Sequence, residues 1–87
     1  MPDERAKKAY DKAAKDFEMA TSTLRLIEAK IMDLNTKIAK GLDGRAMEKT
    51  MATIEKLVKD QRKAGKKQDK AHAAMEKALE ELRKGLT

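Results

Sequence analysis

The sequence predicts an all-α fold, an antiparallel two-helix coiled-coil hairpin formed by residues 1–87 as a single domain. The first observation is the composition, because 41% charged residues with one proline, four glycines, one tyrosine and one phenylalanine are typical of long helices. The second is a lysine at every seventh position of the second half, at Lys49, Lys56, Lys63, Lys70, Lys77 and Lys84. The third is an apolar stripe in each half that repeats with the same heptad period.

The first helix is expected over about residues 2–40. Its apolar stripe alternates steps of four and three residues and consists of Ala6, Tyr10, Ala13, Phe17, Ala20, Leu24, Ile27, Ile31, Leu34 and Ile38. Pro2 suits a first helical turn, and Gly41 suits the left-handed residue that ends a helix.

A short connection is expected at residues 41–44, where Asp43 can cap the next helix. The second helix is expected over about residues 45–84, ended by a second Lys-Gly-Leu sequence at residues 84–86. Its stripe consists of Met47, Met51, Ile54, Val58, Gln61, Gly65, Gln68, His72, Met75, Leu79 and Leu82. So short a connection makes the two helices antiparallel.

The predicted register pairs residues whose numbers add to 85, which sets Ala20 against Gly65 and Phe17 against Gln68. Glycine opposite alanine would let the two backbones approach closely. The alternative is a three-helix bundle with a break near Gly65, since glycine is a poor helix former. The stripe keeps its phase across Gly65, which favours a continuous helix.

A second row of small and apolar residues flanks the stripes and predicts self-association. It consists of Met19 and Leu26 in the first helix and of Leu57, Ala64, Ala71 and Ala78 in the second. Pairing two hairpins through these residues into a four-helix bundle would bury them, so a homodimer is expected. The alternative is a monomer that leaves these alanines on its surface.

The basic side chains of the second helix form a candidate polyanion-binding surface of Lys56, Lys59, Arg62, Lys63, Lys66, Lys67 and Lys70. They could neutralise nucleic-acid phosphates. Against this, the surface contains a single arginine and no interleaved aromatic residue, and these are the residues that supply bidentate and stacking contacts. A solvated outer helix face is therefore the favoured interpretation.

No catalytic, cofactor-binding or metal-binding residue is predicted, and the chain is not expected to be an enzyme. His72 has Asp69 and Glu76 on its side of the helix and Asp16 across from it, but such a set is weak evidence for a metal. A half-buried histidine bonded to Gln68 or Tyr10 is favoured, because buried polar groups need partners.

The absence of cysteine and of a long apolar run predicts a cytoplasmic protein without membrane insertion. The hairpin resembles in outline the small RNA-binding helical hairpins that regulate plasmid copy number, a resemblance of architecture that no motif supports. The favoured function is non-enzymatic protein binding or scaffolding with an unidentified protein partner. The alternative is a small regulator or inhibitor that binds nucleic acid or a nucleic-acid complex through the basic side chains.

Overall fold

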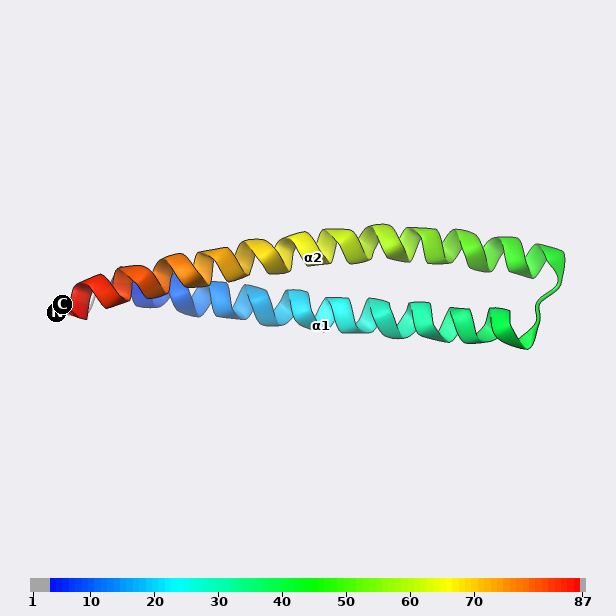
Figure 1. Ribbon diagram of the computed structural model, residues 1–87, viewed down its shortest axis with the longest axis horizontal. Helices are drawn as coiled ribbons and strands as arrows, with labels where there is room; N and C mark the ends of the chain where they lie inside the picture. Colours follow the sequence, from blue (N-terminus) through cyan, green and yellow to red (C-terminus); the bar gives the residue numbers. More distant parts are fainter. Residues whose placement is uncertain (1–3, 87) are drawn as a thin grey trace.

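The predicted hairpin is confirmed. The computed structural model describes residues 4–86, which form helices α1 (Glu4–Lys40) and α2 (Gly44–Leu86). The two helices run antiparallel and side by side, so that both ends of the chain lie at one end of the rod (Figure 1). The rod measures 65 × 16 × 14 Å. Because α2 continues unbroken through Gly65, the three-helix alternative is not what forms.

The connection consists of residues 41–43 and has the two caps that the sequence predicts. Gly41 has a φ of 97°, the left-handed conformation that glycine adopts without strain, and its N–H donates to the Ile38 carbonyl at 3.0 Å. Asp43 Oδ1 accepts from the Ala46 N–H at 2.9 Å. This cap lets α2 begin at Gly44, one residue earlier than predicted.

The second Lys-Gly-Leu sequence does not end its helix at Lys84 as predicted. α2 runs on through Gly85 to Leu86. Gly85 lacks the positive φ of Gly41, so it stays within the helical hydrogen-bond pattern. Glycine can adopt the left-handed conformation that ends a helix, but within residues 4–86 it does so only at Gly41, where the chain turns into the connection.

The apolar stripe of α1 faces α2 at every predicted position. Its alanines are nearly fully covered, with exposed fractions of 1% at Ala6, 4% at Ala13 and 7% at Ala20, and Ile27 is 8% exposed. The remaining six stripe residues are half-buried. Burial of this stripe against α2 is the main source of stability of the two helices.

In α2 one column of the predicted stripe is displaced by one residue. Ala64, Ala71 and Ala78 are 3–6% exposed and form the buried column, together with half-buried Thr50 and Leu57. The predicted members Met51 and Leu79 are instead 54% and 40% exposed, His72 is exposed, and Val58 and Gly65 are half-buried. The observed column (residues 50, 57, 64, 71 and 78) and the predicted column (residues 51, 58, 65, 72 and 79) both have heptad spacing, so the period alone does not show which of them faces α1. The structure selects the alanines because their small side chains let the helices approach closely.

The helices also meet in a different register from the predicted one. Gln68 Nε2 donates to Thr21 Oγ1 at 2.9 Å, and the rings of Phe17 and His72 lie 6.1 Å apart. In both pairs the residue numbers add to 89 instead of 85. Side chains tilt toward the N-terminus of their own helix, so partners in an antiparallel pair come from farther along each chain than the backbone spacing suggests.

Gly65 is not a point of close backbone approach. A Cβ atom built on Gly65 meets no heavy atom within 4 Å. The predicted contact with Ala20 at this level is therefore wrong, and Gly65 is an ordinary helical residue beside the core.

Candidate interaction faces

The hairpin has two broad sides, because each helix contributes flanking positions on both sides of the core. One side is marked by a depression lined by Lys30, Asp33, Thr53, Lys56 and Asp60, together with the core residues Leu34 and Leu57. Positions seven residues apart share a side of a heptad helix. This assigns the lysine row of α2 and the matching positions of α1 to that side, which is named the basic face.

The basic face concentrates positive charge from both helices. Its twelve basic residues are Arg5, Lys12, Lys30, Lys37, Lys40, Lys49, Lys56, Lys63, Lys67, Lys70, Lys77 and Lys84. Its four acidic residues are Asp16, Asp33, Asp60 and Glu81. The net charge of this face is thus +8, larger than the +6 of the whole chain.

Most of these cations have no anionic partner. Lys37 Nζ lies 3.6 Å from Asp33 Oδ2 on an exposed turn, and Arg5 and Lys84 make other interactions. Within the described residues 4–86, the other nine cations form no ion pair. All nine side chains are exposed, so their charges face solvent.

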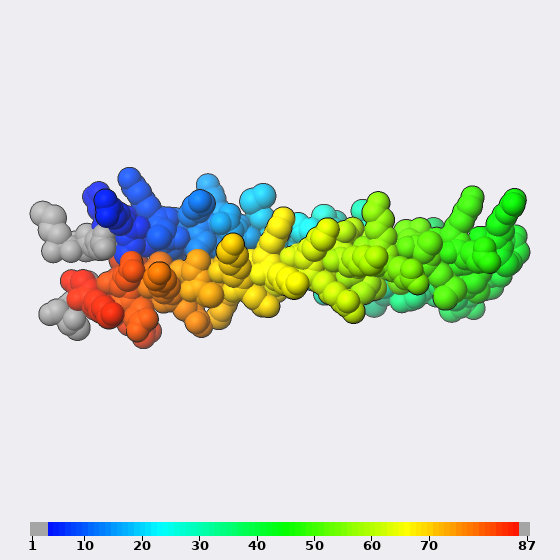
Figure 2. Space-filling model, turned by 90° about the horizontal axis from the view of Figure 1, so that it is seen from above, coloured from blue at the N-terminus to red at the C-terminus, as the bar shows by residue number. Residues whose placement is uncertain are grey.

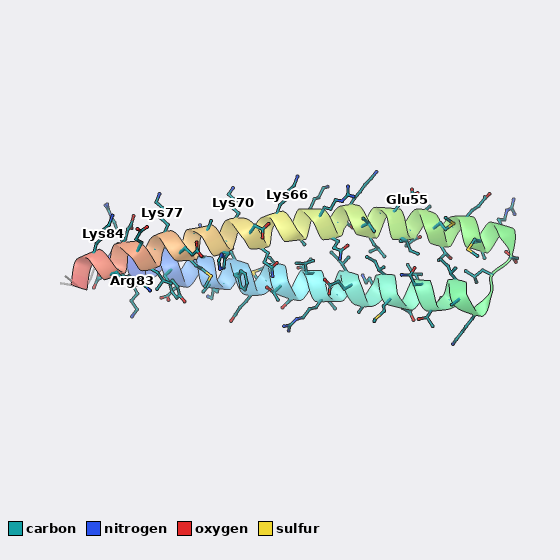
Figure 3. All side chains as sticks on the ribbon, in the orientation of Figure 1. Glu55, Lys66, Lys70, Lys77, Arg83 and Lys84 are labelled. Carbon is teal, nitrogen blue, oxygen red and sulfur yellow. The ribbon has the colours of Figure 1, made fainter. Side chains whose placement is uncertain are left out.

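The structure divides the predicted polyanion-binding residues among three directions. Lys56, Lys63, Lys67 and Lys70 lie on the basic face, and Lys59 and Lys66 lie at the outer edge of α2 beside it. Figure 3 shows Lys66, Lys70, Lys77 and Lys84 projecting from α2 away from α1. Arg62 shares a heptad column with Glu55 and Arg83, which lie on different sides of α2 in this view because the two helices wind around each other. Heptad position assigns Arg62 to the other side of the hairpin from Lys56, Lys63 and Lys70.

The opposite side contains an open groove between the helices and is named the groove face. The groove has a volume of about 460 Å³. Its lining residues are Arg25, Glu28, Ala29, Ile31, Met32, Asn35, Val58 and Gln61. An aliphatic floor with a few neutral and charged polar groups around it is typical of a surface that binds another macromolecule.

The charge of the groove face has the opposite sign. Its eight acidic residues are Glu4, Asp11, Glu18, Glu28, Glu48, Glu55, Asp69 and Glu76, and its four basic residues are Lys7, Arg25, Arg62 and Arg83. The net charge of this face is thus −4. The space-filling view shows a narrow rod with long side chains projecting along one edge (Figure 2).

The structure splits the residues predicted for self-association. Ala64, Ala71 and Ala78 are buried against α1, and Leu57 is half-buried there, so these four pack inside the hairpin. Met19 and Leu26 are 70% and 65% exposed, but they lie on the basic face. A comparable exposed pair lies on the groove face, Met32 at 71% and Met51 at 54%. Their exposure contradicts the interpretation, drawn from the sequence, that these methionines form adaptable core.

His72 is an exposed residue at the edge of the interface. Its side chain is 59% exposed, its Nδ1 atom lies 3.6 Å from Glu76 Oε1, and its ring lies against Phe17. Gln68, one of its predicted partners, bonds to Thr21 instead. Across residues 4–86 no group of three histidine or acidic side chains is arranged to hold a metal ion.

Neither described helix is apolar enough over a sufficient length to cross a membrane. No protein-family model, curated protein or solved structure matches the chain. The interaction faces themselves are thus the basis for inferring function.

Proposed function

We propose that the protein is an interaction module that self-associates, with two hairpins pairing through their groove faces into a four-helix bundle. The observation that supports this proposal is the pair of exposed methionines, Met32 and Met51, beside an apolar groove. Covering these side chains removes apolar surface from water at about 25 cal/mol per Å². A second helical pair supplies the cover that one hairpin lacks.

The charges at the groove suit a second copy of the same chain. A two-fold interface brings the same patch of each copy together, so the patch must complement itself. Arg25 and Glu28 both line the groove and can pair with Glu28 and Arg25 of the other copy. The neutral side chains of Asn35 and Gln61 can hydrogen-bond across the same interface.

The basic face is a poor alternative for self-association. Pairing through Met19 and Leu26 would bring two surfaces of net charge +8 together. Like charges facing each other across an interface cost free energy and slow association. The groove face has a smaller net charge and both signs along its length, so it accommodates a second copy with less repulsion.

Sedimentation equilibrium of matched variants tests the proposal. The wild-type chain is expected to have twice its monomer mass of 9.8 kDa. Met32→Glu with Met51→Glu places four charges in the interface and should give a monomer, with helicity retained in circular dichroism. The control is Met19→Glu with Leu26→Glu, which makes the same change at equally exposed positions of the basic face and should stay dimeric.

A monomeric wild type would contradict the proposal. So would a control variant that dissociates while Met32→Glu with Met51→Glu stays dimeric, because that result assigns self-association to the basic face.

A further inference from the structure

We propose that the basic face binds the phosphate backbone of duplex nucleic acid without reading base sequence. This function goes beyond self-association and uses the opposite side of the hairpin. The surface consists of both helices, with Lys12, Lys30 and Lys40 of α1 joining the lysine row of α2.

Segregation of charge is the first argument. The basic face has twelve cations and four anions, whereas the groove face has four cations and eight anions. Ordinary solvated helix surfaces mix the two signs and form pairs along the helix. Here eight of the twelve acidic residues of the two faces lie on the groove face, and nine exposed cations of the basic face have no ion-pair partner within residues 4–86. A phosphate can therefore bind them without displacing a carboxylate.

Length and spacing are the second argument. Successive lysines of the row are separated by about 10.5 Å at 1.5 Å per residue. The rod is 65 Å long, which spans about two turns of a duplex at ~34 Å per turn. A straight rod along a duplex meets a phosphate backbone where each strand crosses it, so about four phosphates can be contacted.

The aromatic residues favour a duplex over a single strand. Binding of single strands depends on bases stacking on exposed aromatic side chains. The two aromatic residues, Tyr10 and Phe17, are half-buried on the core side of α1. Lysine contacts phosphate as a point charge, and eleven of the twelve cations of the face are lysines, so no base-specific contact is expected.

Fluorescence anisotropy with a labelled duplex of about 20 base pairs, matched to the rod at ~3.4 Å per base pair, measures the binding. The wild-type chain should bind at ~50 mM salt and weaken with a slope of about −4 in log K against log salt. Lys56→Glu with Lys77→Glu should weaken binding at least ~10-fold and lower the magnitude of the slope by about two.

The control is Arg62→Glu with Arg83→Glu. These residues have the same charge, the same exposure and the same separation along α2, but they lie on the groove face. At ~0.1 M salt this variant should bind the duplex within about threefold of the wild type, because its side chains lie on the side away from the duplex and exposed charges are largely screened beyond ~10 Å. Circular dichroism of both variants verifies that the hairpin is intact.

Three results would overturn the proposal. One is no duplex binding by the wild type at ~50 mM salt. Another is an equal loss in both variants, which would reflect total charge instead of the basic face. The third is tighter binding to a single strand, or to vesicles of anionic lipid, than to the duplex. The monomeric Met32→Glu with Met51→Glu variant should still bind, so failure of the self-association proposal is distinguishable from failure of this one.

Discussion

The two halves of the hairpin solve the same packing problem with side chains of different size. In the terminal half, Ala6, Ala13 and Ala20 of α1 and Ala64, Ala71 and Ala78 of α2 are at most 7% exposed. In the loop half, the larger core residues such as Ile31, Leu34, Ile38, Ile54 and Leu57 are only half-buried. Two helices can enclose a methyl group between them, whereas most larger core side chains stay open on one side, Ile27 at 8% exposed being covered as well as the alanines.

This difference explains where the grooves lie. Both depressions are in the loop half, between residues 25–35 of α1 and residues 53–61 of α2. Among residues 4–86, the large exposed apolar residues Leu26, Met32 and Met51 lie in the same half, and Met19 and Leu79 lie in the terminal half. The hollows between the helices are thus what distinguishes the loop half, and a further pair of helices can fill them.

Enlarging a buried alanine should break the terminal half. Ala71→Leu adds three carbon atoms to a side chain that lies between closely approaching helices. The free energy of unfolding should fall by about 2 kcal/mol. Urea unfolding followed by circular dichroism measures the loss. Ala73→Leu is the control, because Ala73 is exposed on the same helix and should change stability little. An equal effect of both substitutions would mean that Ala71 is not in a tight core.

The heptad period predicted the architecture, since it places ten apolar residues of α1 on one side of a long helix, and the short connection makes the second helix antiparallel. The caps at Gly41 and Asp43 followed from residue type. The period did not determine which of two adjacent columns of α2 faces α1. The predicted column contained Met51 and Leu79, whereas close approach of the helices favours alanine, and the error assigned Leu57 and three core alanines to a dimer interface.

Because the wrong column of α2 was assigned to the interface, the separation of charge between the basic face and the groove face was not predicted. The side to which each charge belongs depends on which column faces α1, and Arg62 and Lys63 are adjacent in sequence but fall on opposite faces. From sequence, the basic residues of α2 could be placed within one broad arc but not divided between two faces. The contribution of α1 lysines such as Lys12 and Lys30 became visible only with the register of the two helices.

A substitution at Gly65 should have a smaller effect on stability than Ala71→Leu, and of the opposite sign, within the same terminal half. Its Cβ position is open, so Gly65→Ala should meet no steric obstacle and should raise the free energy of unfolding by about 1 kcal/mol through helix propensity. Gly41→Ala is the matched control and should lower it by about 1 kcal/mol, since Gly41 has a φ of 97°. Destabilisation by Gly65→Ala would show that the helices approach closely at this level.

The smallest change in the free energy of unfolding is expected from enlarging a core residue in the loop half. The change should be an increase, opposite in sign to that of Ala71→Leu. Thr50 belongs to the same heptad column as Ala71 but is half-buried, and its Oγ1 donates to the Ala46 carbonyl of its own helix at 2.7 Å. Thr50→Leu should add apolar contact between the helices and raise the free energy of unfolding by about 0.5 kcal/mol. Thr36→Leu is the control, an exposed threonine that lines neither depression and has the same type of bond to the Met32 carbonyl. If Thr50→Leu destabilised the hairpin as strongly as Ala71→Leu, the loop half would be packed as closely as the terminal half. The exposed methionines would then be incidental, because no incompletely covered core would lie beneath them for a second copy to close.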